Sequence, residues 1–254
     1  MKHKTFISTS YIRKAYRDYE FKPLCVYGPL GYGKSVYAIK ALLQVYFYDR
    51  YEDKTMKQLI KRESKIPFNQ LEDKSIIIKT IKEHMLYTPQ QFITKIKTMH
   101  EHHDRELLLI LDDAGIWLDS LNWNDPFVKS VSEYMQMART DWGSIMFTAP
   151  LPICITKKIR SLPDMMNGQI RKISGSSYII KGKRYRECAL DEHGEEKSQI
   201  IAFNKTKIKG GKKKEDYFSL KLSNYIWFWY KNLREKMTEV ASRKMRKRLP
   251  SFVD

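Results

Sequence analysis

Two short stretches of the chain carry residue types that together could bind and cleave a phosphate chain. The first follows the apolar run 24–27 and matches G-x-x-x-x-G-K-[ST] without a break: Gly28, Pro29, Leu30, Gly31, Tyr32, Gly33, Lys34 and Ser35. Glycines let successive backbone N–H groups turn inward around a triphosphate, a lysine reaches the β and γ phosphates, and a hydroxyl ligates Mg²⁺. The pattern predicts a nucleotide-binding loop that extends to Val36. The alternative is a glycine-rich turn, since so short a pattern also occurs by chance.

The second stretch is the apolar run 107–111, which ends in Asp112 and Asp113. Such a run predicts a buried parallel strand that presents carboxylates at its carboxyl end. We expect Asp112 to hold Mg²⁺ through water together with Ser35, and Asp113 to act as the general base that polarises the attacking water. A buried strand that ends in a capped turn is the alternative. The nucleotide interpretation requires both stretches to converge on one metal ion.

Two weaker candidates complete the predicted ATP and Mg²⁺ site. Thr148 ends the short apolar stretch 143–150, where a polar side chain could touch the γ phosphate or the attacking water. Arg160 ends a short helix predicted over 152–160 and could reach the nucleotide of a neighbouring subunit. It could equally be a simple cation at the negative end of that helix. Arg139, at the end of the preceding helix, is a second candidate for the same role.

The elements that must position these residues alternate between helix and strand, so residues 1–167 predict an α/β core, a parallel sheet flanked by helices. A charged insertion, residues 49–73, has no assigned chemistry. The periodicity and the turn signals indicate the following elements: helices over 9–19, 36–48, from Thr88 to about His102, and over 127–139; strands over 22–27, 75–80, 106–111 and 143–150.

From residue 168 to residue 254 the pattern changes to a predicted β-meander followed by a C-terminal amphipathic helix. Short strands are expected over 169–173, 177–181, 184–190 and 199–204. Lys205 to Lys214 holds six lysines, which indicates either a basic loop for phosphates or a solvated hairpin tip. The helix is predicted from an apolar face spaced by four and three residues: Ile226, Tyr230, Leu233, Met237 and Val240.

The charge of the chain favours a polyanionic partner. The 47 basic and 29 acidic side chains leave a formal net charge of +18, of which +12 lies from residue 168 onward. A generally basic surface would not concentrate the charge in this way. Residues 243–248 contain five basic side chains and could neutralise DNA phosphates without reading sequence. We therefore expect non-specific DNA binding through the C-terminal third.

Three widely separated cysteines, Cys25, Cys154 and Cys188, predict neither a disulfide framework nor a zinc site. No stretch approaches the roughly 20 apolar residues that a membrane span needs, and no secretory signal is evident. These observations predict a soluble, cytoplasmic protein.

The chain resembles the AAA+ P-loop ATPases in the order of its motifs. That order is the glycine-rich loop, the Thr80-tipped strand, the Asp112-Asp113 strand, the Thr148-tipped strand and the Arg160-bearing helix. The chain looks most like their DnaA/DnaC-like branch, including the DnaA-like ATPases of archaeal viruses and plasmids. The resemblance covers about residues 20–165. It implies a five-stranded parallel sheet and a homo-oligomer with nucleotide between subunits.

Two features depart from that family. The predicted β-meander stands where a small helical lid is usual, and no helix-turn-helix for reading an origin is evident.

Three functions remain open. The first is an Mg²⁺-dependent ATPase acting on DNA in replication initiation, helicase loading or mobile-genome maintenance, with a replication or packaging partner. The second is a packaging or translocating motor, and the third is a DNA-binding protein that holds ATP without hydrolysing it. A small-molecule kinase is less favoured, because no second substrate pocket is evident.

Overall fold

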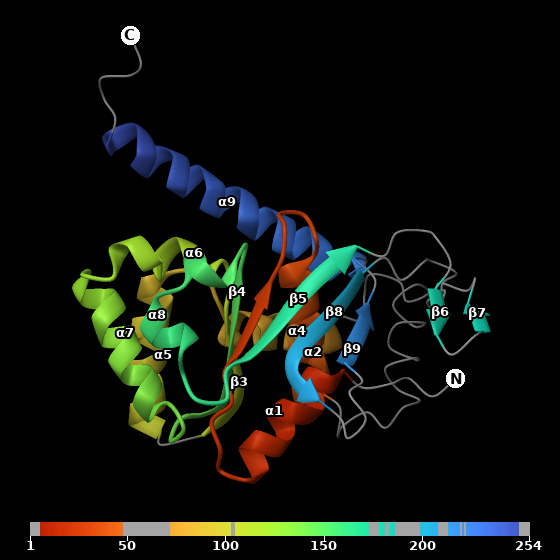
Figure 1. Cartoon of the computed structure of the whole chain (residues 1–254). Helices are drawn as coiled ribbons and strands as arrows, with labels where there is room; N and C mark the ends of the chain where they lie inside the picture. The colour runs from red at the N-terminus through yellow and green to blue at the C-terminus, as the bar shows by residue number, and fades with distance from the viewer. Residues whose placement is uncertain are drawn as a thin grey trace.

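Five parallel strands form the centre of the protein, in the spatial order β2-β3-β4-β1-β5 (Figure 1). The computed structural model describes residues 6–47, 72–102, 105–172, 178–180, 183–185, 199–207, 213–218, 220 and 222–248. The parallel strands are β1 (Leu24–Tyr27), β2 (Met85–Leu86), β3 (Glu106–Leu111), β4 (Trp142–Ala149) and β5 (Met166–Lys172). The expected α/β core with a parallel sheet is therefore confirmed.

Helices cover both faces of this sheet, because each strand buries alternate side chains on opposite sides. Leu108 and Ile110 of β3 belong to a core shared with α2 (Lys34–Phe47). Leu109 and Leu111 belong to a second core on the other face, which includes residues of α5 (Pro89–His102), α7 (Pro126–Met137) and α8 (Lys157–Arg160). Helix α1 (Ile7–Arg17) packs with the first core.

The strand predicted over 75–80 is wrong, because these residues lie in the helix α4 (Glu72–His84). Ile77, Ile78 and Ile81 have the three- and four-residue spacing of a helical face, and all three pack on the first core. Burial of this face overrides the β propensity of the branched side chains. Thr80 consequently lies inside α4 and does not end a strand, and the edge strand β2 comes directly after α4.

The C-terminal third continues the same sheet. Residues 169–173 were expected to begin a meander, but β5 pairs in parallel with β1 and so completes the parallel sheet. The predicted boundary between residues 167 and 168 lies inside this strand. Strands β8 (Gln199–Lys207) and β9 (Lys213–Phe218) then add two antiparallel strands at its edge.

Other parts of the predicted meander are only partly described. Strands β6 (Tyr178–Ile180) and β7 (Lys183–Tyr185) form a separate antiparallel pair. The predicted strand residues 186–190, the middle of the lysine-rich stretch (208–212) and most of the charged insertion 49–73 lie outside the described residues.

The last described element is the helix α9 (Asn224–Arg248), which confirms the predicted C-terminal amphipathic helix. Ile226 and Tyr230 are buried in the first core, and Leu233 and Met237 pack partly against it. Figure 1 shows the C-terminal half of α9 extending beyond the sheet and the other helices. Within the described part of the chain, no helix is both long and apolar enough to cross a membrane.

Candidate functional site

The predicted site residues converge at the carboxyl end of the parallel sheet. Leu86 pairs with Leu111, Leu111 with Phe147, and Val26 with Thr148. One residue further along, this register brings Tyr87, Asp112 and Thr148 to the same level, next to the loop that follows β1. Because β4 lies between β1 and β3, Thr148 stands between that loop and Asp112. Ligands of open α/β sheets bind at this edge.

The glycine-rich loop, residues 28–35, contains two backbone positions that favour glycine. Gly31 and Gly33 have φ angles of 78° and 82°, in the left-handed region that favours glycine. Lys34 begins α2 and folds back into the loop, where Nζ donates hydrogen bonds to the carbonyl oxygens of Gly28 (2.9 Å) and Pro29 (3.0 Å). Burial lowers the pKa of this ammonium group, and the acidic groups of Asp113 and Asp112 oppose the shift.

The remaining loop residues differ in exposure. Leu30 is 78% exposed at the tip, Tyr32 packs partly against the first core, and Val36 is buried inside α2. The start of a helix such as α2 offers N–H groups and a positive dipole end to an anion, and its first turn contains no acidic residue that would oppose one.

Asp112 is the meeting point of the site. Ser35 Oγ donates to both oxygens of its carboxylate, at 2.8 and 3.0 Å, and Thr148 Oγ1 donates to Oδ1 at 2.6 Å. Tyr230 of α9 lies 3.4 Å from Oδ2 through its hydroxyl oxygen. The two predicted metal ligands, Ser35 and Asp112, are therefore in direct contact, although they stand 77 residues apart in the sequence.

The carboxyl group of Asp112 is fully buried, and this burial together with the nearby charge of Asp113 raises its pKa to about 6. Hydrogen bonds from Thr148 and Ser35 oppose the shift. The groups that donate hydrogen bonds to this carboxylate are neutral hydroxyls, so its negative charge is not fully balanced by a cation. A divalent metal ion would supply that charge.

Asp113 has a left-handed backbone, with φ 49° and ψ 38°, and precedes the short helix α6 (Ala114–Trp117). Non-glycine residues in this region cluster at functional sites. Thr148 Oγ1 accepts a hydrogen bond from the backbone N–H of Asp113 (2.8 Å), so one hydroxyl positions both aspartates. The carboxylate of Asp113 forms an ion pair with the guanidinium of Arg234, whose Nη1 also lies 4.0 Å from Asp112 Oδ2.

Three residues at this site escaped the sequence analysis: Tyr87, Tyr230 and Arg234. Tyr230 was predicted only as part of the apolar face of the C-terminal helix, and Arg234 was only one of many cations there. Their four-residue spacing places them on one side of α9. The hydroxyl of Tyr87 is buried and has no hydrogen-bond partner among the described residues. Burial raises the pKa of Tyr87, and the charge of Asp112 raises it further.

The two arginines considered for action on a neighbouring subunit lie elsewhere. Arg160 ends α8, and its Nε donates to the carbonyl oxygen of Ile155 (2.8 Å). Arg139 follows α7, and its carbonyl oxygen accepts a hydrogen bond from Arg105, directly before β3 begins. Arg139 therefore lies at the amino end of the sheet, opposite Asp112. In the described residues neither side chain contacts Asp112 or Asp113.

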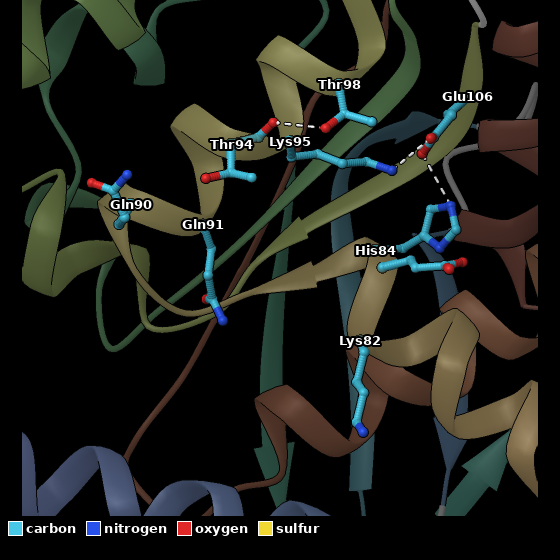
Figure 2. Close-up of a pocket in the computed structure, with 9 residues that line it drawn as sticks. Lys82, His84, Gln90, Gln91, Thr94, Lys95, Thr98 and Glu106 are labelled. Atoms are coloured by element: carbon cyan, nitrogen blue, oxygen red, sulfur yellow. Dashed lines mark hydrogen bonds and ion pairs between the residues drawn. The ribbon is translucent and has the colours of Figure 1, made fainter. Parts of the chain in front are cut away.

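A polar hollow of about 480 Å³ also lies at the amino end of β3 (Figure 2). Glu106 forms ion pairs there with Lys95 (2.6 Å) and His84 (3.0 Å). Burial would raise the pKa of Glu106, but hydrogen bonds from His84 and Lys95 lower it overall. The carboxylate of Glu106 is thus engaged by neighbouring side chains, and the hollow is lined by none of the predicted site residues.

The arrangement at the carboxyl end fits a metal ion with a phosphate ligand. Mg²⁺ typically takes one or two protein oxygens and completes its coordination with water and substrate phosphates. Ser35 and Asp112 would provide those oxygens, while Lys34 and the loop backbone would face the phosphates. No protein-family model matches the chain, and no curated protein shows significant similarity to it.

Proposed function

We propose that the protein is an Mg²⁺-dependent P-loop ATPase that acts on DNA, similar in its core to the AAA+ proteins. One observation carries this proposal. Residues of the loop after β1, the end of β3 and the end of β4 form a single hydrogen-bonded cluster around Asp112. Two motifs that were interpreted separately as phosphate-binding and metal-binding thus meet at one carboxylate.

The roles within the proposed reaction follow from these positions. The loop and Lys34 hold the triphosphate, Ser35 and Asp112 hold Mg²⁺, and Asp113 orients the attacking water. Mg²⁺ supplies charge that stabilises the phosphates. The unpartnered Tyr87 hydroxyl further supports a ligand here, because an unsatisfied buried hydroxyl costs about 1–3 kcal/mol. A bound water molecule or phosphate oxygen would satisfy it.

ATP hydrolysis by point variants tests the proposal. Lys34→Ala should reduce turnover to background, because the phosphates lose their cation. Asp113→Asn should bind ATP within a few-fold of the wild type and hydrolyse it about 100-fold more slowly, in line with the loss of a general base. Lys97→Ala, on the exposed side of α5, is the matched control and should hydrolyse normally. Wild-type turnover in Lys34→Ala would refute the assignment.

A second candidate is a DNA-binding protein that holds ATP without hydrolysing it. The ion pair between Asp113 and Arg234 favours this candidate, since it engages the carboxylate that would otherwise orient water. ATP binding with no phosphate release, in both the presence and the absence of DNA, would support it over the ATPase.

The proposed assembly is a homo-oligomer with nucleotide between subunits. The case for a catalytic arginine from a neighbour rests on the resemblance alone, because Arg160 and Arg139 contact neither Asp112 nor Asp113 among the described residues. Sedimentation with and without ATP would establish whether nucleotide drives assembly.

A further inference from the structure

Helix α9 touches the candidate site with its first half and carries a dense basic sequence in its second half. Tyr230 and Arg234 contact Asp112 and Asp113 across 118 and 121 residues of sequence. Beyond Arg234, the helix contains six basic and two acidic residues up to Arg248. An α-helix rises about 1.5 Å per residue, so some 20 Å of helix follows Arg234.

We propose that α9 couples nucleic-acid binding to the nucleotide site, with the ion pair between Arg234 and Asp113 as the contact that opens when a nucleic acid docks on the basic half of the helix. The proposal rests on the function proposed above and adds its regulation.

The ion pair with Arg234 restrains the carboxylate of Asp113, the group proposed to orient the attacking water. A general base must lie within hydrogen-bond reach of the proton that it takes. The carboxylate of Asp113 instead accepts a hydrogen bond from Arg234. Tyr230 likewise lies against Asp112, the proposed metal ligand. Tyr230 is buried in the first core, so displacement of α9 beyond Tyr230 would release Asp113 and leave the Tyr230 contact in place.

The attachment of α9 to the body is weak beyond Tyr230. Leu233 and Met237 are only partly buried, and the Arg234 side chain remains 42% exposed. A partly exposed ion pair contributes little to stability. The other side chains of α9 between residues 231 and 239 are exposed to solvent: Lys231, Asn232, Glu235, Lys236, Thr238 and Glu239. A modest binding energy at the far end could therefore shift the helix.

The partner that fits the basic half is a nucleic acid. The five basic residues between Arg243 and Arg248 match the closely spaced phosphates of such a polymer, and neutralising them releases counterions. Magnesium nucleotide and nucleic acid would both favour the state in which Arg234 has left the carboxylate of Asp113. Two ligands that favour the same state bind cooperatively, and the effect is reciprocal.

The test compares full-length wild type with Arg234→Gln and with Lys231→Gln as the matched control. Lys231 lies on the same helix, is exposed, and pairs with Glu235 instead of the site. Arg234→Gln should raise basal ATP turnover several-fold, and a double-stranded oligonucleotide should add little to it. Lys231→Gln should keep the basal rate and the stimulation of the wild type. Turnover of Arg234→Gln below the wild-type rate, or full stimulation in that variant, would overturn the proposal.

A binding measurement keeps the test independent of hydrolysis. In the wild type, a non-hydrolysable ATP analogue should tighten oligonucleotide binding at least five-fold, and Arg234→Gln should remove this effect. If the wild type binds the analogue but releases no phosphate, the ATPase proposal fails while the coupling can still be measured. No change in oligonucleotide affinity in the wild type would overturn the coupling. Stimulation by anionic lipid vesicles but not by the oligonucleotide would overturn the choice of partner.

Discussion

At Asp112, hydroxyl groups from three distant parts of the chain surround one buried carboxylate. Ser35, Thr148 and Tyr230 all approach it, and the charge of Asp113 lies beside it. Hydroxyl groups stabilise a carboxylate less than a cation does, which is why its pKa stays above the usual value of 3.8. The site therefore holds negative charge that has not been fully compensated, which is the property on which the proposed metal ion rests.

This pKa shift leads to a pH-dependent stability in the absence of Mg²⁺. The folded protein binds the Asp112 proton more tightly than the unfolded chain does, so protonation stabilises the fold. The free energy of unfolding of the wild type, relative to Asp112→Asn, should fall by up to about 3 kcal/mol as the pH rises from about 3 to about 7, through the unfolded and folded pKa values. Above about pH 7 the difference should remain constant. Urea denaturation across this range measures it, and a flat difference would contradict the assigned burial effect.

At the scale of elements, the C-terminal strands hold the first helix in place. Helix α1 has no side-chain cap of its own, and the buried carboxylate of Asp216 in β9 takes that role from the far end of the sequence. It accepts hydrogen bonds from the backbone N–H groups of Ile7 (2.7 Å) and Ser8 (3.5 Å) and from the hydroxyl of Tyr37 (2.8 Å). A negative charge at a helix N-terminus is stabilising.

Replacing this carboxylate should destabilise the whole fold. Asp216→Asn retains an acceptor oxygen but loses the charge, and its amide group would face N–H donors. We expect a loss of about 2–3 kcal/mol in the free energy of unfolding, the range for hydrogen bonds to charged groups. Glu133→Gln, exposed on α7, is the control and should change stability by less than about 0.5 kcal/mol. Equal stability of the two variants would show that β9 does not anchor α1.

At the scale of the whole molecule, one helix, α9, joins the candidate site to the basic stretch 243–248. The loop after β1 also lies close to the segment between β9 and α9, because a Cβ atom added at Gly33 would lie 2.2 Å from the Leu220 side chain. Strands β5, β8 and β9 of the C-terminal third thus belong to the same sheet as the first two thirds, and α9 reaches the same site. The basic residues 243–248, part of the excess charge of that third, lie on this helix.

Nucleic-acid affinity should therefore be non-specific and strongly salt-dependent. Each phosphate contact contributes a slope of about −0.9 to the plot of log affinity against log salt concentration. Replacement of the five basic residues between Arg243 and Arg248 by glutamine should make this slope less steep by up to about 4.5. Fluorescence anisotropy with oligonucleotides of different sequence measures both effects, with Lys97→Gln as the control. An unchanged slope would place the binding surface elsewhere.

The sequence by itself determined the loop, the acidic strand end and the Thr148 strand end, because each depends on local requirements. Neighbouring residues are enough to specify glycines at positive φ, an uninterrupted apolar run or a helix cap. The cap of α5 illustrates this, since the Thr88 hydroxyl accepts the N–H of Gln91 at the start of the helix that the sequence predicts from Thr88. Parallel pairing then brings such strand ends to one edge.

Only the tertiary structure decided that α4 is a helix, that β5 joins the parallel sheet, and that α9 reaches the carboxylates. The isoleucines of α4 suit either structure locally, and burial of one helical face decides between the two. Tyr230 and Arg234 meet Asp112 and Asp113 because α9 packs through Ile226 and Tyr230 on the first core. Such contacts depend on the summed packing of elements far apart in the chain, and no spacing of neighbouring residues encodes them.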